Sequence, residues 1–390
     1  MTRTLSIRPI DVLYLRGNRL FGTTGDFAHA NMPPWPSVFA GALRARILVD
    51  KTIGFKDFLE GRVADPEVKA ALGSPQSPGS FQLSAVGLRA NGSNCYPAPM
   101  DLVPPEPQGS HCIRITPSDV LSAQGIRSSY PLAYLPILRE EKPSKKKTWW
   151  IKEEGLALHL AGKEVHKDYL VDPFESLWEL DPRLGIALDP NSRSVETGKI
   201  YTTEAIALKP GVSFVVTVHG ADRVLPSSGL IRFGGDGRGA EIAPVADKSL
   251  PDPLRVPLQG RRFRLILSTP GIFPPGNHDE GWLPPAVFYE TGDYILRHPK
   301  LTAKLVCAAV PRLEVVSGWD IAEHKPKEAI RVVPAGSVYW FEAENENTEV
   351  LEQLRTEGLW LLLHIQRGSV DGFWAARRAE GFNNVWIGNW

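Results

Sequence analysis

The sequence predicts an α+β protein built from two domains of similar plan. Its 390 residues exceed what one ordinary hydrophobic core organises. Each half begins with a strand-like run, continues through mixed helical and extended patterns, and ends in a glycine turn that leads into a last strand. The 35 glycines and 34 prolines occur in clusters and form no repeat, so long ordered loops are expected between these elements.

The first domain opens with a strand over residues 5–10, which continues as extended chain to residue 16. Glycines and prolines in residues 22–36 then exclude regular structure. Ser37 is a good N-cap, and the apolar spacing that follows predicts the first helix over residues 38–47. Further strands are expected before the second domain, at residues 81–88, 200–208 and 212–218.

Gly41 interrupts the predicted first helix. A glycine inside a helix costs about 1 kcal/mol relative to alanine, so we expect something to pack closely there. Packing on the sheet and contact with a ligand are both open explanations.

A long, proline-interrupted excursion separates the strands of the first domain, and we assign an insertion to about residues 95–185. Its segment 142–150 joins a basic run to Trp149 and Trp150. The two indoles could stack on nucleic-acid bases, or the segment could be a solvated hairpin tip.

The second domain follows a linker-like segment, residues 250–257. Its strands are expected at residues 262–270, 305–310 and 337–342, its helix at residues 345–358, and its closing strand after the glycine turn in residues 381–390. We therefore place the domains at residues 1–250 and 258–390. The two halves resemble a diverged duplication of the ferredoxin-like βαββαβ plan.

Residues 229–242 concentrate five glycines and two arginines between two strand-like runs. Glycines let a ligand approach the backbone and arginines neutralise phosphate, so the loop has the composition of an anion cradle. It fits no Walker A pattern, and its loose dinucleotide fingerprint precedes Pro244 where a helix should begin. A glycine loop of the kind found in RNA-binding ferredoxin-like domains and an ordinary tight hairpin both remain open.

The composition limits the partners that the chain can take. Lys plus Arg and Asp plus Glu both number 44, so a nucleic-acid site must be a local patch. Cys95, Cys112 and Cys307 have no zinc-site spacing, and we expect them to be small buried residues of a protein from a reducing compartment. The sequence has no long apolar run, so we predict a soluble cytoplasmic protein with no membrane partner and no metal or other cofactor.

Several motifs in order resemble a known family. They lie at residues 7–16, 19–21, 33–44, 185–186, 198–201, 233–238, 317–320 and 333–339. This set is similar to the subunit of type III-B CRISPR effector complexes (Cmr complexes) that holds the 5′ end of the CRISPR RNA. That family belongs to the RAMP superfamily, so the resemblance implies two ferredoxin-like domains with a long insertion in the first. A loop made richer in glycine by Gly239 is the one departure from the pattern.

The resemblance implies that the chain binds the 5′ tag of the CRISPR RNA (crRNA) and has no catalytic role. It would lie beside the large palm-domain subunit and next to a backbone RAMP subunit, with target RNA as a further possible contact, in defence against foreign RNA and DNA. A single strand is recognised through phosphates, stacking and base edges. The residues of the family motifs that we expect at the RNA are Arg16, Arg19, Ser37, Gly41, Arg44, Arg193, Lys199, Tyr201, Arg232, Gly234, Gly235 and Arg238.

The search for catalytic residues finds scattered histidines without a HExxH motif or an HD pair. Asp26 and His29 share the loop before the first helix, where RAMP ribonucleases also place catalysts. The alternative function is therefore a RAMP endoribonuclease that processes precursor CRISPR RNA with these two residues. A metabolic enzyme with a phosphate loop is a third possibility.

Overall fold

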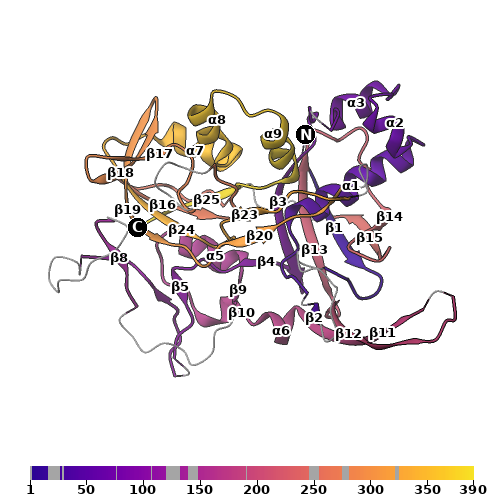
Figure 1. The fold of residues 1–390 in the computed structure, drawn as a ribbon. Coiled ribbons are helices and arrows are strands. Elements are labelled where there is room, and N and C mark those ends of the chain that lie inside the picture. The colour runs from indigo at the N-terminus through magenta and orange to yellow at the C-terminus, as the bar shows by residue number, and fades with distance from the viewer. Residues whose placement is uncertain are drawn as a thin grey trace.

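The computed structural model describes residues 2–15, 27–28, 30–75, 77–106, 108–119, 132–138, 148–189, 191–245, 254–274, 281–320 and 325–390. Two antiparallel sheets dominate this part of the chain, the first from strands within residues 2–244 and the second from strands within residues 262–389. Figure 1 shows them as the indigo-to-pink and the orange-to-yellow halves of the molecule. The predicted mixture of helices and strands is confirmed. Within the described ranges, no helix has the length and apolar character needed to cross a membrane.

The first sheet has eight strands. In spatial order they are β10 (Leu170–Val171), β9 (Trp150–Lys152), β4 (Ser93–Pro97), β3 (Gln82–Ala90), β13 (Val212–His219), β1 (Thr2–Pro9), β15 (Gly239–Pro244) and β14 (Gly229–Arg232). The central strand β1 lies antiparallel to both neighbours, with Ile7 opposite Phe214 on one side and Ile242 on the other. The strands expected over residues 5–10, 81–88 and 212–218 are confirmed, and the predicted insertion adds β4, β9 and β10 to the sheet.

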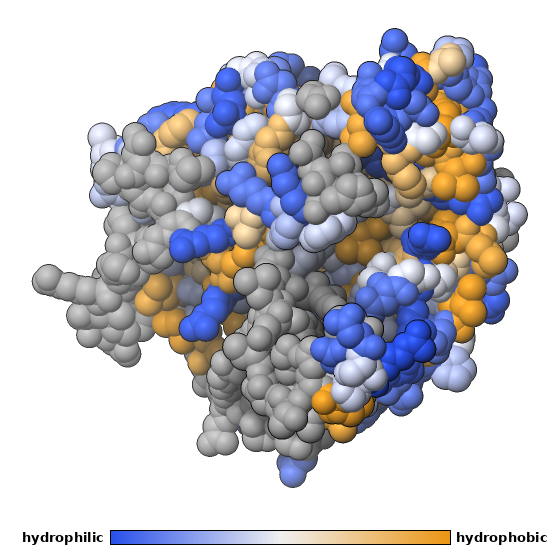
Figure 2. Space-filling view, turned by 45° about the vertical axis from the view of Figure 1, so that its right-hand side comes forward, coloured by the Kyte–Doolittle hydropathy of each residue, from blue (hydrophilic) through white to orange (hydrophobic). Residues whose placement is uncertain are grey.

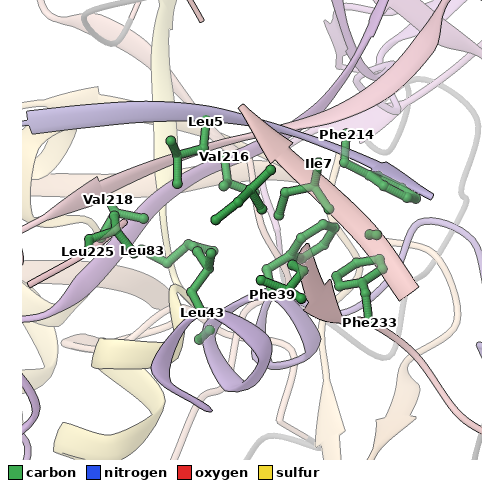
Figure 3. Close-up of a cluster of buried hydrophobic side chains, with 14 of the residues drawn as sticks. Leu5, Ile7, Phe39, Leu43, Leu83, Phe214, Val216, Val218, Leu225 and Phe233 are labelled. Carbon is green, nitrogen blue, oxygen red and sulfur yellow. The ribbon is translucent and has the colours of Figure 1, made fainter. Parts of the chain in front are cut away.

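Helix α1 (Pro36–Asp50) covers one face of this sheet. Figure 3 shows Phe39 and Leu43 pointing from the helix into a cluster with Leu5, Ile7 and Phe214 of the sheet, all fully or almost fully buried. The Phe39 ring lies 5.3 Å from the Phe214 ring, edge to face. Two short helices follow, α2 (Phe55–Leu59) and α3 (Pro66–Leu72). The predicted helix therefore exists and extends beyond residues 38–47 at both ends.

The second sheet has six strands. In spatial order they are β17 (Val287–Glu290), β18 (Asp293–His298), β19 (Leu301–Ala309), β24 (Val338–Ala343), β16 (Arg262–Leu267) and β25 (Val385–Asn389). The strands expected at residues 262–270, 305–310 and 337–342 are confirmed as β16, β19 and β24. Helices α7 (Thr348–Glu357), α8 (Trp360–Arg367) and α9 (Gly372–Glu380) connect β24 to β25, and α7 confirms the helix expected at residues 345–358.

A long hairpin extends from the body of the first domain. It consists of β11 (Trp178–Leu188) and β12 (Val195–Leu208), and the two-residue strand β2 (Phe27–Ala28) runs parallel to β12. Figure 1 shows the hairpin reaching away from both sheets. The remaining described elements are small: helices α5 (Glu153–Leu160) and α6 (Pro173–Ser176), the 3₁₀ turn η1 (Lys167–Tyr169), and the strand pairs β20 (Glu314–Val316) with β23 (Ile330–Val332), β21 (Trp319–Asp320) with β22 (Lys325–Pro326), β5 (Leu102–Val103) with β6 (Ile113–Arg114), and β7 (Pro117–Ser118) with β8 (Leu135–Pro136).

Strand β14 forms the outer edge of the first sheet. Outer strands present backbone groups that another chain can pair with. Here a side chain of α1 covers part of that edge, because the Arg46 guanidinium donates from Nη1 to the Leu230 carbonyl at 2.5 Å. The same guanidinium forms an ion pair with Asp50 at 2.8 Å, which fixes it along the helix.

A fully buried ionic cluster joins the two sheets. Arg264 of β16 donates to the Asp101 carboxylate, to the His159 carbonyl at 2.5 Å and to the Asn389 carbonyl at 2.9 Å. His159 Nε2 lies 2.8 Å from the other Asp101 oxygen, and the side chains of Asp101, His159 and Arg264 are 0% exposed. Burial alone would raise the pKa of Asp101, but its interactions with His159 and Arg264 outweigh burial and hold that pKa well below its usual range.

The charge of Arg264 is predicted to be essential for stability. Arg264→Met keeps much of the side-chain volume but leaves the Asp101 carboxylate buried without its cation, so the free energy of unfolding should fall by about 3–5 kcal/mol. Urea unfolding at pH 7 measures the change. The matched control is Arg262→Met on the same strand, because Arg262 is 57% exposed in its ion pair with Glu342 and should cost less than about 1 kcal/mol. Equal losses in the two variants would contradict this role of the cluster.

Candidate nucleic-acid interface

The glycine loop predicted as an anion cradle is a tight turn between β14 and β15. The Phe233 N–H donates to the Arg238 carbonyl at 2.8 Å and closes the turn. Gly234, Asp236 and Gly237 have φ angles of 82°, 56° and 68°, in the region that glycine enters without a steric penalty. The sequence left open an RNA-binding glycine loop and an ordinary tight hairpin, and the backbone of this loop is that of a tight hairpin.

The loop packs on the chain's own Tyr14. The Gly235 N–H donates to the Tyr14 carbonyl at 2.8 Å. A Cβ atom added at Gly234 or Gly235 would lie 3.1 or 3.2 Å from that carbonyl oxygen, so the lack of a side chain permits this approach. The close contact that we expected between these glycines and a phosphate is therefore made, in the free chain, with protein backbone.

The two arginines of the loop differ in their surroundings. Arg238 forms an ion pair with Asp11 at 2.6 Å, and its guanidinium lies 5.1 Å from the centre of the Tyr14 ring. Arg232 is exposed, and no acid within the described ranges pairs with it. Arg232 is thus the loop arginine whose charge is available to an anion, whereas Arg238 also holds the turn against Tyr14.

Tyr14 links the loop to the base of the β11–β12 hairpin. The neighbouring residue Leu13 exchanges two backbone hydrogen bonds of 2.8 Å with Ile206 of β12. Arg183 of β11 bonds to Asp181 at 2.8 Å and to Tyr14, and these contacts raise the pKa of Arg183. Sequence reasoning missed Arg183. The sequence feature that could have revealed Arg183 is a charged residue on the strand face opposite to that of Leu180 and Leu184.

The hairpin carries the next three candidates. A Cβ atom at Gly185 would lie 2.3 Å from Tyr201 Cζ, so the Tyr201 ring occupies the space that this glycine leaves on the opposite strand. Arg193 is exposed at the tip, with a φ of 52°. Asp189 caps that tip by accepting from the Ser192 N–H at 2.8 Å, and such bonds lower its pKa. Lys199 belongs to β12, and its side chain lies outside the described set.

The start of α1 differs from the prediction. The N-cap is Trp35, which makes no side-chain cap bond, and Pro36 occupies the first turn. Proline suits that position because its fixed φ is already helical and it lacks an N–H. The expectation that Ser37 caps the helix was therefore wrong. It missed that Pro36 could itself begin the helix.

Gly41 and Arg44 lie on α1 in different environments. A Cβ atom at the exposed Gly41 would meet no described atom within 4 Å, so the predicted close packing on the sheet is not found among those residues. The Arg44 guanidinium lies 5.9 Å from the centre of the Phe81 ring. Burial lowers the pKa of Arg44, and the Glu380 carboxylate of α9 opposes that shift.

The candidates thus form three groups in the described structure. Arg232, Gly234, Gly235 and Arg238 lie at the turn that packs on Tyr14, and Arg193, Lys199 and Tyr201 lie on the β11–β12 hairpin. Ser37, Gly41 and Arg44 lie on α1. Arg16, Arg19, Asp26 and His29 fall outside the described residues, as does the basic run at residues 142–147. Trp150 is buried in β9, 5.6 Å from the Trp178 ring, and so is not a surface stacking platform.

Other chemistry in the described ranges is limited. They contain no group of three or more His, Cys, Asp or Glu residues arranged to hold a metal ion. Cys95 and Cys307 are buried free thiols, and Cys112 is a half-buried one. Burial raises the pKa of Cys95 and of Cys112 to about 11 and that of Cys307 to about 12, so these thiols are protonated near neutral pH.

Comparison with known proteins identifies a family across almost the whole chain. Residues 5–390 match the family model described as CRISPR-associated protein Cas_Cmr3. The sequence matches none of the curated proteins.

Solved structures give distant likenesses. A chain of a type III-B Cmr-beta complex bound to cognate target RNA is 17% identical, with 98% of this chain and 96% of that chain covered and a TM-score of 0.47. A chain of the same kind of complex with target RNA and AMPPNP is 19% identical, with 87% and 86% covered and a TM-score of 0.45. A chain of a Csm3–Csm4 subcomplex of a type III-A CRISPR-Cas interference complex is 10% identical, with 89% and 96% covered and a TM-score of 0.31. The family assignment rests on the family model.

Proposed function

The chain belongs to the Cmr3 family of CRISPR-associated proteins, and from this premise we propose that it is a non-catalytic RNA-binding and assembly subunit of a type III-B effector complex. In this role it grips the 5′ tag of the crRNA. The large palm-domain subunit and a backbone RAMP subunit are its protein partners.

The proposal includes two ferredoxin-like domains. In that fold four antiparallel strands are arranged in the spatial order 4-1-3-2. The sequence β15–β1–β13–β3 in the first sheet and β25–β16–β24–β19 in the second both have this order when numbered along the chain. The strand order supports the assignment. The first sheet retains the first helix of the plan as α1, and the second retains the last helical connection as α7 to α9.

The exposed cation at the glycine turn carries the proposal. The chain has equal numbers of basic and acidic residues, and several arginines of the site are already paired. Arg232 is exposed without such a partner in the described ranges, and it adjoins a turn fixed on Tyr14. If only a few phosphates are bound here, the affinity should depend weakly on salt. The logarithm of the binding constant should fall by about 0.7 per unit of log salt concentration for each phosphate of a single strand.

The open position on α1 supports a second contact with the RNA backbone. No atom of the described residues lies within 4 Å of a Cβ placed at Gly41, which follows Ser37 by one helical turn. A nucleic-acid backbone can approach a helix closely only where side chains are small. Figure 2 shows hydrophilic and hydrophobic residues interleaved on the side of the first domain, which suits contacts to sugar and base as well as to phosphate.

Arg232 should be measurably important for RNA affinity. Arg232→Ala removes one phosphate contact of about 1 kcal/mol, so binding of a single-stranded RNA with the tag sequence should weaken about fivefold. Filter binding at fixed salt measures this, and the salt slope should fall by about 0.7.

Arg223→Ala is the matched control for that measurement. Arg223 is also an exposed arginine, 83% accessible, but it follows β13 at the end of the sheet where His219 pairs with Thr2, opposite the glycine turn. Its loss should leave affinity and slope unchanged. If Arg232→Ala behaves like Arg223→Ala, the turn is not part of the RNA site.

The hairpin supports the assembly role. Leu180, Leu184, Ile186 and Leu188 share one face of β11 and are 41%, 73%, 46% and 53% exposed. A two-stranded ribbon is marginally stable by itself, and apolar residues gathered on such an arm mark a surface that a partner covers. We assign this face to the backbone RAMP subunit.

Leu184→Asp is predicted to weaken that assembly. A charge at the most exposed leucine of the face must be desolvated on docking, so at least tenfold less complex should form with the backbone subunit. Size-exclusion chromatography after co-expression with both partners and guide RNA measures the complex. Phe288→Asp, at a phenylalanine 40% exposed on β17 of the second sheet, is the control. Normal assembly of the Leu184→Asp protein would assign the face to another role.

The non-catalytic role is tested at the two residues favoured by the nuclease alternative. Asp26→Ala and His29→Ala should leave cleavage of target RNA by a reconstituted complex unchanged, because catalysis is assigned to other subunits. The isolated chain should also leave repeat RNA intact. Cleavage of repeat RNA that disappears in the His29→Ala protein would support the precursor-processing function instead.

A further inference from the structure

A cavity of about 290 Å³ lies where the two sheets meet. The first domain contributes aromatic walls from Trp35, Trp150 and Phe214, and the second domain contributes Pro270 and Pro334. This volume is near the lower end of the range for ligand pockets, about 300 Å³, so it suits one small ring system better than a longer ligand.

A few polar groups interrupt these apolar walls. Asn31, Ser268, Arg312 and Glu314 line the same cavity. Apolar walls with a small number of polar groups are typical of sites that bind a flat ligand with polar edges.

The second-domain wall is held in place by the glycine turn that precedes β25. Asn383 is fully buried; its side chain accepts from the Ile272 N–H at 2.6 Å and donates to the Ile272 carbonyl at 3.1 Å. Thr269 Oγ1 accepts from the Asn384 N–H at 3.0 Å. The segment that supplies Ser268, Thr269 and Pro270 is therefore preformed.

The cavity adjoins the α1 group of candidate residues. Trp35 and Pro36 both line it, and Pro36 opens the helix that carries Ser37 and Gly41. The cavity therefore lies at the N-terminal end of the helix that carries these candidates.

We propose that this cavity holds one nucleobase of the bound RNA, turned out of the base stack. The inference rests on the proposed RNA-binding function. It adds the place where a base is held.

The charges favour a base over a phosphate. Arg312 and Glu314 contribute one positive and one negative side chain, so the cavity offers a phosphate little net attraction. A base has apolar faces for the tryptophan and proline walls, and its edges carry both donors and acceptors for the amide, guanidinium and carboxylate groups. A purely apolar ligand would leave those polar groups without partners.

An abasic scan of the tag RNA tests the proposal with the full-length protein. One nucleotide at a time is replaced by an abasic residue in a single-stranded RNA of the tag sequence, and the affinity is measured by filter binding. With the wild-type protein, one position should weaken binding about tenfold, since stacking and edge contacts of a single base are lost together.

Ala335→Leu links that position to the cavity. Ala335 is a half-buried lining residue, and a leucine there fills space that a base needs. The variant should bind the unmodified RNA about tenfold more weakly, and the abasic change at the sensitive position should then cost nothing further. Ala343→Leu, at a half-buried alanine beyond the cavity on β24, should keep the full abasic effect. Thermal unfolding of both variants checks that they fold.

The outcomes separate this inference from the proposed function. RNA binding that depends on Arg232 but shows no single sensitive position, or a sensitive position unaffected by Ala335→Leu, overturns the base pocket and leaves the RNA role intact. If Ala335→Leu does not fold, a 2-aminopurine at the sensitive position, which should be quenched on binding wild-type protein, decides instead, and unchanged emission overturns the pocket. Absence of any tag binding by the wild-type chain, alone and with its partners, removes the proposed function itself.

Discussion

The buried charge of Arg264 is the constraint on which the arrangement of the two sheets depends. A guanidinium without solvent must have all its donors matched, and here the acceptors come from the insertion of the first domain and from the last strand of the second. Moving one sheet relative to the other would separate Arg264 from Asp101 or His159. The ionic cluster therefore sets the position of the sheets more narrowly than apolar packing alone.

Two other features rely on that fixed arrangement. The Tyr96 ring of the first sheet meets the Trp386 ring of the second at 5.3 Å, edge to face, in a core shared by both domains. The junction cavity also takes its walls from both sides. A cavity divided between two domains keeps its shape only if the domains do not move, and Arg264 supplies that rigidity.

The pairing of charges bears on how a chain without net charge could make the proposed contact with RNA phosphates. Arg44, Arg183 and Arg238 lie against aromatic rings or acids, and so act first as structural groups. Arg232 and Arg193 are exposed at turns. Selectivity for RNA would then depend on where a few arginines are held, because a protein without net charge attracts RNA only weakly at long range.

The sequence predicted the class of fold and most strands of both sheets, because strand alternation and glycine turns are local signals. It also predicted α7, on which Val350, Leu351 and Leu354 are buried at helical spacing. Sequence reasoning could not find the partners of Arg238 or Arg264. Arg238 and Asp11 are 227 residues apart in the chain, and nothing local distinguishes an arginine that will be paired from one that will be free. The buried Arg264 looked like the polar position of a half-buried strand.

Sequence reasoning was least successful where one residue type serves two purposes. Glycines in the turn after β14 suggested a ligand, but their first role is to admit the Tyr14 carbonyl. On α1 the reverse holds, since Gly41 has no close neighbour among the described residues although a glycine inside a helix suggested packing. Steric freedom is visible in a sequence, whereas the group that uses it depends on the tertiary fold.

The Arg46 contact at the outer strand has a consequence for how copies of this chain meet. Because Arg46 already occupies the Leu230 carbonyl, a second molecule cannot extend the first sheet at that point without displacing a guanidinium. At this point of its outer strand the chain is therefore less open to pairing with a second copy of itself. The guanidinium ends the sheet at Leu230, where a bare carbonyl would act as a template for another strand.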